Sequence, residues 1–581
     1  MLDNPEVKTQ LRSKQHKHNT RIYNEKMTDY ILEVNNRNYT DVVVRNRNTQ
    51  CIEEDLLINP AQHKLFHGDI FLYDEGHCIK LETTSNLKKI AGVLMLEGNK
   101  TFGREKNRLL YKCIPYDKRL PVFLVPYEMK IGFNKHYKNK YVLFSFVHWN
   151  DKHPYGKLDE TIGDVTELTH TSDYLIYCAG LHYSYKMVNN KVRSIKSTYD
   201  VLYQELVNSN KYNLQERYDD YVFSIDPLGS TDLDDAFSIE VVSEHMTIIR
   251  VYIANVSVWL DYFDVWSDMS EQCSTIYLPN KKRSMLPSIL GDDYCSLKEK
   301  KQKITQVYEF IIKDGVIIHE ETKCYNACIH VKKNFHYEDN RLENNEHYWK
   351  FMLCTKLLTN NPNLDSHELV SYWMIKSNEW MANTLSTYKK GMFRISHFTN
   401  KVDDTITNKE TRHFIQNYLN SHCEYSLYQE QLQHELMEQD KYLHVTSPIR
   451  RMTDIINQTI YHQEQGLSMS IYSYDFVNKW LTVIHKLNDQ VKKIKKVQNQ
   501  MNILYAIEHN QVDISKSYVS CIFQKECVDD GYMYQVFIKE LSLFQQVYST
   551  NSLDMYSDVE VKIFYMNDEF QTYKKIRCTM V

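Results

Sequence analysis

Glycine and proline are scarce in this sequence, with 15 and 11 residues respectively, whereas tyrosine occurs 44 times. Together with a charged content of 25%, this aromatic content argues against a globally disordered chain. No internal repeat with a period of about 20–50 residues is present. At about 150 residues per domain, the length of 581 residues predicts about four domains with hydrophobic cores of their own.

Cysteine pairs at metal-binding spacing are absent, although the chain has 13 cysteines. Cys324 and Cys328 are four residues apart, and Cys521 and Cys527 are six apart, but neither pair has histidines at zinc-site spacing. We therefore predict no structural zinc. The scattered cysteines are typical of reduced thiols in a cytosol-like compartment.

Long apolar runs are absent too. No stretch of 18 apolar residues occurs, and the polar, basic start "MLDNPEVKTQLRSKQHKHNTR" lacks the apolar segment of a secretory signal. We expect an intracellular protein without a membrane span, in the cytoplasm rather than the nucleus, with residues 1–20 as a flexible tail. The run "KKIKK", residues 492–496, fits a helix face as well as a nuclear signal.

An excess of positive charge is also missing, because the formal net charge is −5. The overall charge therefore does not indicate a nucleic-acid partner. A polyanion would need a local groove of lysine and arginine side chains. Ordinary solubility is the simpler interpretation of a mildly negative chain.

Short β-branched or aromatic runs fill the first 180 residues, among them "YTDVVVRNR", "GDIFLYDEG", "IAGVLMLEG" and "KYVLFSFVHWN". They predict small β-barrels of OB-fold size, divided near residues 84–86. Helical periodicity appears in "STYDVLYQELVN" and dominates residues 347–508, and residues 516–581 return to strands. We therefore predict a multidomain α+β protein: two N-terminal β-barrels, a large mixed α/β domain and a C-terminal β-barrel.

Four aspartates gather in "VFSIDPLGSTDLDDAFSIE", residues 222–240, between two β-type apolar runs: Asp226, Asp232, Asp234 and Asp235. Pro227 fixes a bend and Gly229 supplies the freedom to turn. Carboxylates this close together cannot all stay ionised without a counter-charge. Mg²⁺ supplies one, and it binds a few carboxylates together with water and phosphate oxygens. Two such ions can stabilise the attacking and leaving oxygens of a phosphoryl displacement.

Two other interpretations of this cluster remain open. Acidic loops are often simply solvated, although the flanking runs "YVFSI" and "AFSIEVV" make a fully exposed loop a poorer fit. A calcium-binding EF-hand fits worse, because the twelfth-position glutamate and the helix-loop-helix frame are both missing.

A second cluster is "HVTSPIRRMTDIINQ", residues 444–458. Pro448 after Ser447 predicts a helix start, with Arg450 and Arg451 in the first turn. Arg450 and Asp454 are four apart and can pair on such a helix. Planar guanidinium groups also suit phosphate oxygens, so the motif fits either a phosphate site or a salt bridge at a helix start.

These two motifs together resemble the RNase II/RNase R family of 3′→5′ exoribonucleases, which carry an RNB domain. The run "STIYLPNKKRSMLPSILGDDYCSL", residues 274–297, is similar to a third family motif, and all three occur in the family order. The cues "HGDIFLYDE", "IPYDKRLPVFLV" and "VHWNDKHPYGKLDETIGDV" look like the eukaryotic exosome-associated branch, without the endonuclease domain that precedes the barrels there.

The resemblance implies cold-shock-type OB folds over residues 21–86 and 87–185, an RNB catalytic domain over 186–515 and an RNA-binding OB fold over 516–581. It implies a channel for single-stranded RNA, and hydrolysis to nucleoside 5′-monophosphates with Mg²⁺, or alternatively Mn²⁺, in a two-metal mechanism. Processive and distributive action both remain open. We expect a monomer, with an exosome-like or other delivery complex as a possible partner.

The resemblance also assigns roles to the acidic cluster. Asp226, Asp232 and Asp235 match metal ligands of the family, and Asp234 would hold a second ion or orient the attacking water. Arg450 matches the residue that clamps the scissile phosphate, and Asp234 and Arg450 are thus the expected catalytic residues.

Three further residues are expected to contact RNA. Tyr277 matches an aromatic residue that stacks against terminal bases, and Tyr337 falls where another RNA-contacting tyrosine lies. Arg451 supports either the fold or a neighbouring phosphate. Stacking tolerates any sequence, because every base has a π-face.

The sequence departs from the family in its helical region. Ser371 and Tyr372 replace a pair of glutamates near the ribose, which weakens the expected discrimination of RNA from DNA through the 2′-hydroxyl. The segment before "SHELV" lacks a strand pair with a second clamping aromatic residue. Two alternatives therefore stand beside an active exoribonuclease: an inactive RNA-binding protein of the same fold, and an exonuclease with relaxed discrimination between RNA and DNA.

Overall fold

The computed structural model describes residues 28–581 except 75–76, 84, 129–136, 196, 397–410, 413–414, 416–422, 436–438, 529, 542 and 568–573. The predicted tail of residues 1–20 lies outside the described residues. The chain divides into two compact units, Met1–Gly180 with Phe564–Arg577, and Leu181–Ile563 with Cys578–Val581. No helix in the described part of the chain is both long and apolar enough to cross a membrane.

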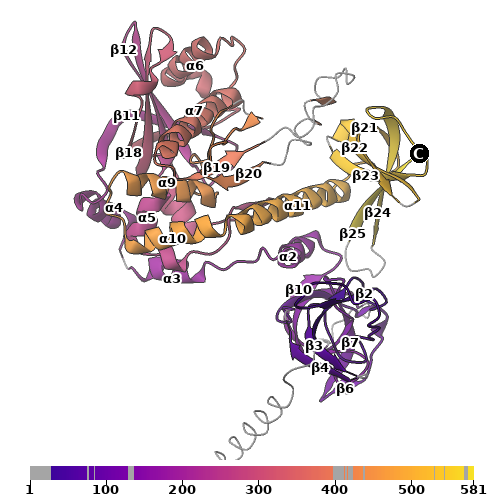
Figure 1. Cartoon of the computed structure of the whole chain (residues 1–581). Helices are drawn as coiled ribbons and strands as arrows, with labels where there is room; N and C mark the ends of the chain where they lie inside the picture. Colours follow the sequence, from indigo (N-terminus) through magenta and orange to yellow (C-terminus); the bar gives the residue numbers. More distant parts are fainter. Residues whose placement is uncertain are drawn as a thin grey trace, which may run out of the picture. The chain divides into compact units, whose positions relative to one another are not determined.

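The first unit contains two β-structures. A four-stranded antiparallel sheet has the order β2-β1-β3-β4, with β1 at Asp29–Val34, β2 at Val42–Asn46, β3 at Ile70–Asp74 and β4 at His77–Glu82. A second sheet has the order β5-β9-β10-β8-β7-β6, and the pairing of β5 with β7 closes it into a barrel (Figure 1). Its strands are β5 Ile90–Leu94, β6 Arg104–Glu105, β7 Arg108–Pro115, β8 Phe123–Tyr127, β9 Lys140–His148 and β10 Tyr155–Asp164.

Alternating apolar positions explain this barrel. In strand β9, KYVLFSFVH, the alternate residues Val142 and Phe144 lie in one core with Phe66, Phe123 and Trp149. Helix α2, Leu168–Cys178, follows the last strand of the barrel. The quoted N-terminal runs all form strands, as the sequence predicted.

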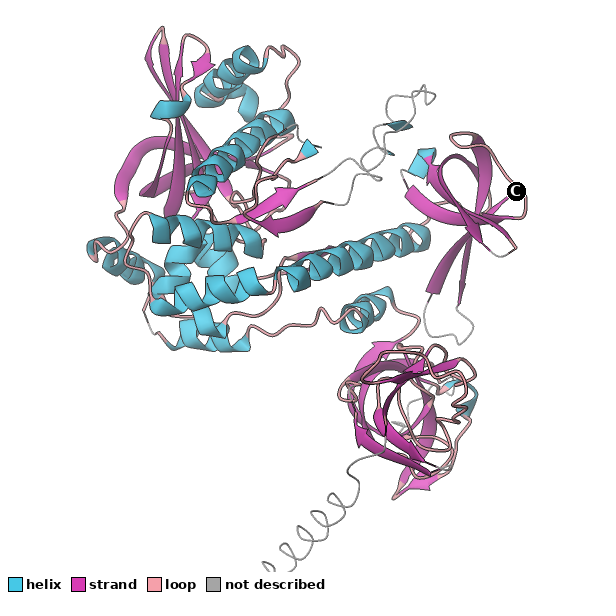
Figure 2. Ribbon diagram, viewed as in Figure 1, coloured by secondary structure: helices cyan, strands magenta, loops and turns pink. Residues whose placement is uncertain are grey.

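The second unit is built on a six-stranded mixed sheet of order β13-β12-β11-β18-β16-β17. The strands are β11 Gln215–Asp226, β12 Asp235–Ser243, β13 Met246–Ala254, β16 Gln302–Lys313, β17 Val316–Ile317 and β18 Lys323–His336. Strands β11 and β18 run parallel, and the other pairs in this sheet are antiparallel. Helices α6, Glu346–Thr359, and α7, Ser366–Thr387, lie beside it (Figure 2).

Aromatic side chains join this sheet to its helices. Phe237 of β12 lies 5.1 Å from Phe351 of α6, measured between ring centroids, and Phe351 stacks on Trp373 of α7 at 5.9 Å. All three residues are buried. Large buried rings of this kind dominate the apolar contribution to a core, which fixes the two helices against the sheet.

The remaining elements of the second unit are mostly helical. They are α3 Lys186–Ser194, α4 Tyr199–Asn208, α5 Val256–Tyr262, the hairpin β14 Ile276–Leu278 and β15 Lys281–Arg283, the pair β19 Met392–Ile395 and β20 Glu424–Leu427, α9 Met452–Glu464, α10 Ile471–Thr482 and α11 Ile484–Glu508. The helical stretch over residues 471–508 therefore consists of two helices, α10 and α11, which meet at Val483.

The C-terminal part of the chain forms a five-stranded sheet of order β23-β22-β21-β24-β25. Its strands are β21 Ser517–Val528, β22 Gly531–Ile538, β23 Leu543–Ser549, β24 Asp558–Asn567 and β25 Lys574–Met580. The multidomain α+β fold is thus confirmed, with OB-type β-structures towards both ends of the sequence and a mixed α/β domain between them.

Candidate active site

The four aspartates flank the turn that joins β11 to β12. Strand β11 ends at Asp226 and β12 begins at Asp235. Between them Gly229 has φ 83°, and the Ser230 N–H donates to the Pro227 carbonyl over 3.1 Å. This is the turn that proline and glycine predict. It brings all four carboxylates to the wall of one cavity of 870 Å³.

The parallel pairing of β11 with β18 places an aromatic ring beside the turn. Asp226 pairs in register with His336, so the next residue, Tyr337, lies at the same end of the sheet. The Tyr337 N–H donates to the Asp226 carbonyl over 3.2 Å. Its ring lines the cavity and stacks on His367, with ring centroids 3.7 Å apart and planes 16° apart.

Asp234 is the most buried of the four aspartates, with 2% of the residue exposed. Its Oδ1 accepts a hydrogen bond from the Ile449 N–H over 2.8 Å, and its Oδ2 accepts one from Arg450 Nε over 3.1 Å. Burial raises the pKa of Asp234 to about 7, and the charge of Arg450 opposes this shift. The structure therefore joins the two expected catalytic residues directly.

Asp226 and Asp235 each present a buried carboxylate oxygen, Oδ2, that accepts no hydrogen bond within the described part of the protein. Burial raises the pKa of Asp226 to about 6. Burial also raises the pKa of Asp235 well above its ordinary value, and the neighbouring charges of Asp226 and Asp234 add to that shift. Unpartnered buried carboxylates are costly, so these two atoms mark a place where a ligand is needed.

Asp232 has a different environment, because both of its carboxylate oxygens are occupied. Tyr277 Oη donates to its Oδ2 over 2.8 Å, and Lys282 Nζ donates to its Oδ1 over 3.0 Å. The two donors come from opposite strands of the β14–β15 hairpin. Tyr277 is 41% exposed, so it binds Asp232 while part of its side chain stays open to solvent.

A divalent cation fits part of this donor set. Among the described residues, no group of three or more histidine, cysteine or acidic side chains is already arranged to hold a metal ion. The two unpartnered oxygens of Asp226 and Asp235 are nevertheless the hard donors that Mg²⁺ prefers, and Mg²⁺ binds through one or two carboxylates plus water and substrate phosphate. Asp232 and Asp234 are held by protein donors instead.

The arginine motif differs from the sequence prediction in two respects. Helix α9 begins at Met452, so Arg450 and Arg451 precede the helix and do not lie in its first turn. Asp454 pairs with Arg451 over 2.9 Å, whereas Arg450 turns to Asp234. The predicted pairing of Arg450 with Asp454 is therefore wrong, because the backbone at residues 448–450 forms a turn and the buried Asp234 lies within reach.

Arg450 links the arginine motif to the hairpin. Its side-chain Nη2 donates to Ser447 Oγ over 2.8 Å, which leaves 43% of the side chain exposed at the cavity. Its carbonyl accepts a hydrogen bond from the Thr275 N–H over 3.0 Å, just before β14. Gln498 of α11 in turn donates to the Tyr277 carbonyl over 3.0 Å. The hairpin is thus fixed on both sides.

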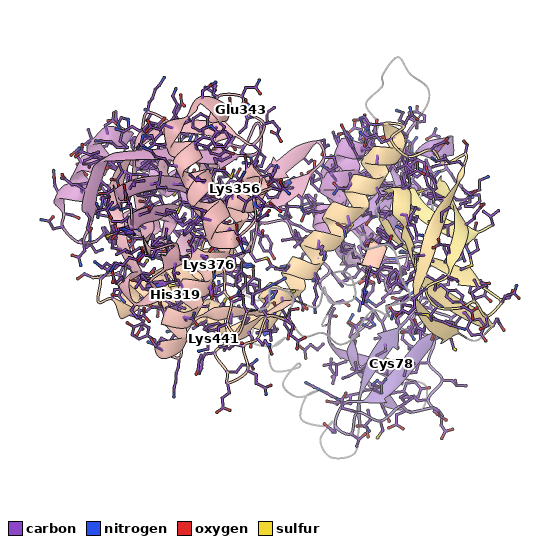
Figure 3. The ribbon with its side chains drawn as sticks, turned by 90° about the horizontal axis from the view of Figure 1, so that it is seen from above. Cys78, His319, Glu343, Lys356, Lys376 and Lys441 are labelled. Carbon is purple, nitrogen blue, oxygen red and sulfur yellow. The ribbon has the colours of Figure 1, made fainter. Side chains whose placement is uncertain are left out.

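Of the α7 wall of the cavity, the sequence indicated only Ser371, and it did not indicate one cation, Lys282. Val370, Ser371, Met374, Ile375 and Asn378 line the cavity from α7 and carry no charge. The charged Lys376 of this helix, labelled in Figure 3, pairs with Glu379 over 2.9 Å instead. Lys282 could have been found from "YLPNKK", because a hairpin turn at Pro279 and Asn280 places its side chain opposite Tyr277.

Comparisons with known proteins agree with this geometry. Residues 215–346 and 341–464 match the model of the RNB domain, and residues 110–178 match the Dis3-like cold-shock domain 2. The RNB match contains the acidic turn, the β14–β15 hairpin and the arginine motif. The fold and the acidic cavity thus define an RNB-domain protein.

Relatives place the chain more narrowly. It is 26% identical over 290 residues to the DIS3-like exonuclease 2 of Xenopus tropicalis, a match of 48% of this chain and 34% of that protein. The match therefore spans about a third of the relative's length. Together with the domain matches, this similarity bears out the resemblance to the RNase II/RNase R family of RNB-domain proteins, with a cold-shock domain of the Dis3-like type.

Two solved structures share the fold. Mycoplasma genitalium RNase R, solved in complex with ribose-methylated single-stranded RNA, aligns with a TM-score of 0.64 at 16% identity, over 95% of this chain and 100% of that one. Yeast Ssd1, described as a pseudonuclease, aligns with a TM-score of 0.56 at 14% identity, over 94% of this chain and 82% of that one. The same architecture thus occurs in a nuclease and in a pseudonuclease.

Proposed function

We propose that this protein is a divalent-metal-dependent 3′→5′ exoribonuclease that hydrolyses single-stranded RNA to nucleoside 5′-monophosphates. The observation that carries the proposal is the cavity in which Arg450 binds the buried Asp234 beside two unpartnered carboxylate oxygens, on Asp226 and Asp235. The polarity of degradation and the product rest on the resemblance to the RNase II/RNase R family.

Asp226 and Asp235 would hold the metal ion, with Asp232 and Asp234 nearby as further ligands in a two-metal arrangement. A bound Mg²⁺ supplies Lewis-acid stabilisation of the scissile phosphate and lowers the pKa of a bound water. The loss of protons from the raised-pKa carboxyls of Asp226 and Asp234 would accompany ion binding.

Arg450 supplies the positive charge that the protein itself contributes. Its Nε is fixed by Asp234, and its exposed part faces the cavity, where it can donate to a phosphate oxygen. A cation held in place before the reaction stabilises developing negative charge without reorganisation during the chemical step. Asp234 orients this guanidinium in addition to any role towards a second ion.

Tyr277 and Tyr337 would hold the last nucleotides of the RNA. Both rings line the cavity, and they lie on different elements, β14 and the segment after β18. Stacking on such rings binds any base, which suits an enzyme that degrades RNA of any sequence. Arg451 is bound to Asp454, and this ion pair supports a structural role more than a phosphate contact.

The experiment is product analysis from 5′-labelled single-stranded RNA with Mg²⁺, comparing wild type with Asp234→Asn. We expect wild type to release nucleoside 5′-monophosphates and the variant to lose at least about a hundredfold in rate, since Arg450 loses its charged partner. Asp314→Asn is the matched control, because Asp314 pairs with His245 at the surface and its side chain is 76% exposed. Equal rates for wild type and Asp234→Asn would overturn the proposal.

A second candidate function is RNA binding without catalysis. It is favoured by the full occupation of Asp232 by Tyr277 and Lys282, and by the fold shared with a pseudonuclease. This candidate predicts RNA binding that does not respond to metal, with no release of nucleotides. The product analysis separates it from the first.

A third candidate is an exonuclease that also accepts DNA. The α7 wall of the cavity offers Ser371, Asn378 and apolar side chains, without a carboxylate to receive a ribose hydroxyl. Competition between RNA and DNA oligonucleotides of the same sequence tests it. A strong preference for RNA would contradict it.

A further inference from the structure

Lys282 and Tyr277 form a matched pair on Asp232. They lie opposite each other in the register of the β14–β15 hairpin, so one short hairpin delivers both polar ends to the same carboxylate. Lys282 Nζ is 3.0 Å from Oδ1 and Tyr277 Oη is 2.8 Å from Oδ2. The Asp232 side chain is 11% exposed, whereas the side chain of Lys282 is 26% exposed, so the carboxylate is largely buried and its donors are partly open to solvent.

The other three aspartates of the cavity show what this contact does. Arg450 neutralises Asp234, whereas Asp226 and Asp235 keep buried oxygens without partners. Lys282 and Arg450 thus pair with two of the four carboxylates, and the unpartnered oxygens of Asp226 and Asp235 remain for a divalent ion. Lys282 occupies Asp232, the carboxylate that such an ion would take as a further ligand.

The two cations differ in how firmly they are held. Arg450 is a planar guanidinium fixed by Asp234 and Ser447. Lys282 is an ammonium on a flexible stem, with 26% of its side chain exposed. It also has neighbours to which it can move, because Thr231 Oγ1 lies at 2.6 Å and Asp292 Oδ1 lies at 3.8 Å. A divalent ion can therefore displace the ammonium from Asp232 without leaving it unpaired.

We propose that Lys282 is an internal cation that holds Asp232 when no divalent ion is bound and competes with that ion for it. Lys282 is then a positioning residue that sets the metal affinity of the cavity. The inference rests on the proposed metal site and names the residue that tunes it. Exchange of the ammonium for the ion also releases Lys282 towards Asp292.

The test is metal binding to the full chain without RNA, with Mn²⁺ as the probe and electron paramagnetic resonance of the free ion as the readout. Lys282→Met removes the competing charge, so we expect Mn²⁺ to bind about three- to tenfold more tightly than to wild type. Lys282→Arg keeps a cation at this place, and its affinity should stay within about twofold of wild type.

Lys350→Met is the matched control for net charge. Lys350 lies on α6, is 46% exposed in its side chain and pairs with a single carboxylate, Glu346. We expect this variant to bind Mn²⁺ as wild type does. Unchanged or weaker binding by Lys282→Met, or an equal gain by Lys350→Met, would overturn the inference.

Failure of this inference can be told apart from failure of the proposed function. Wild type that degrades RNA, while Lys282→Met binds Mn²⁺ as wild type does, overturns only the role of Lys282. If Lys282→Met binds Mn²⁺ more tightly than wild type does, but wild type releases no nucleotides from RNA, only the proposed nuclease activity is overturned. Wild type that binds no Mn²⁺ overturns the role of Lys282 and the metal site together.

Discussion

Arg450 and Arg451 are adjacent in the chain, yet their guanidinium groups serve different carboxylates. Arg450 reaches Asp234 from the other motif, 216 positions away, whereas Arg451 pairs with Asp454 at the start of α9. The Asp454 side chain is fully buried, and that of Asp234 is 2% exposed. Both arginines line the cavity, but 43% of the Arg450 side chain is exposed, compared with 24% of the Arg451 side chain.

We therefore expect Arg451→Met to destabilise the protein by about 1–3 kcal/mol, because it leaves a buried carboxylate without its charged partner. Arg450→Met should lower the rate of nucleotide release far more than it lowers stability, since Asp234 can take up a proton and keeps the Ile449 N–H. Thermal unfolding of both variants, beside their rates on RNA, measures the difference. A larger stability loss for Arg450→Met would contradict the assignment.

A second prediction follows from the pKa of Asp226, which burial raises to about 6. The native carboxyl holds its proton more tightly than the unfolded chain, whose aspartates titrate near pH 3.9. Without metal, this group therefore costs stability as the pH rises from about 4 to about 7. In EDTA, Asp226→Asn should gain in melting temperature relative to wild type between about pH 5 and pH 8.

If the difference in melting temperature between wild type and Asp226→Asn stays constant with pH, the pKa of Asp226 is not raised. Added Mg²⁺ should reverse the loss of wild-type stability with rising pH, because the ion binds Asp226 in its deprotonated form. Its stabilising effect is expected to grow with pH over the same window.

Among the elements, the β14–β15 hairpin has two roles that a pair of substitutions separates. Tyr277 offers a ring for stacking and a hydroxyl for Asp232. Tyr277→Ala should weaken binding of single-stranded RNA by about 1–3 kcal/mol, because a stacking surface is lost. Tyr277→Phe keeps the ring, and we expect its RNA affinity to stay close to the unsubstituted protein.

Fluorescence anisotropy with labelled RNA, in the Asp234→Asn background that prevents degradation, measures both affinities. Equal losses for the phenylalanine and alanine variants would mean that the hydroxyl, and not the ring, matters for RNA. The hairpin would then act only through Asp232.

The strands and helices also show what the local pattern of apolar residues can predict and what it cannot. The pattern of apolar residues located the strands and helices, including α4 and α7, because amphipathic periodicity is a local property. It could not place the start of α9. Pro448 suits a first helical turn, but the tertiary contacts of Ser447 and Arg450 hold this segment in a non-helical turn until Met452.

For the whole molecule, the net charge of −5 means that RNA must be held by local groups, and that affinity should fall steeply as salt rises. We expect the full chain to bind single-stranded RNA in EDTA without releasing nucleotides, and to release them once Mg²⁺ is added. Filter binding and product analysis on the same samples measure both. Release in EDTA would contradict a metal-dependent mechanism, and binding without release in Mg²⁺ would favour the inactive alternative.

The sequence by itself determined the order of domains and the presence of an acidic turn, because strand patterns, proline, glycine and four closely spaced aspartates are all local features. The sequence also showed that the arginine motif follows the acidic turn in the order found in the RNase II/RNase R family. Only the tertiary structure decided which carboxylates are free. Lys282 and Arg450 lie 50 and 216 residues from the aspartates they bind, and ion pairs between such distant residues form only after the sheet, the hairpin and the helix have packed.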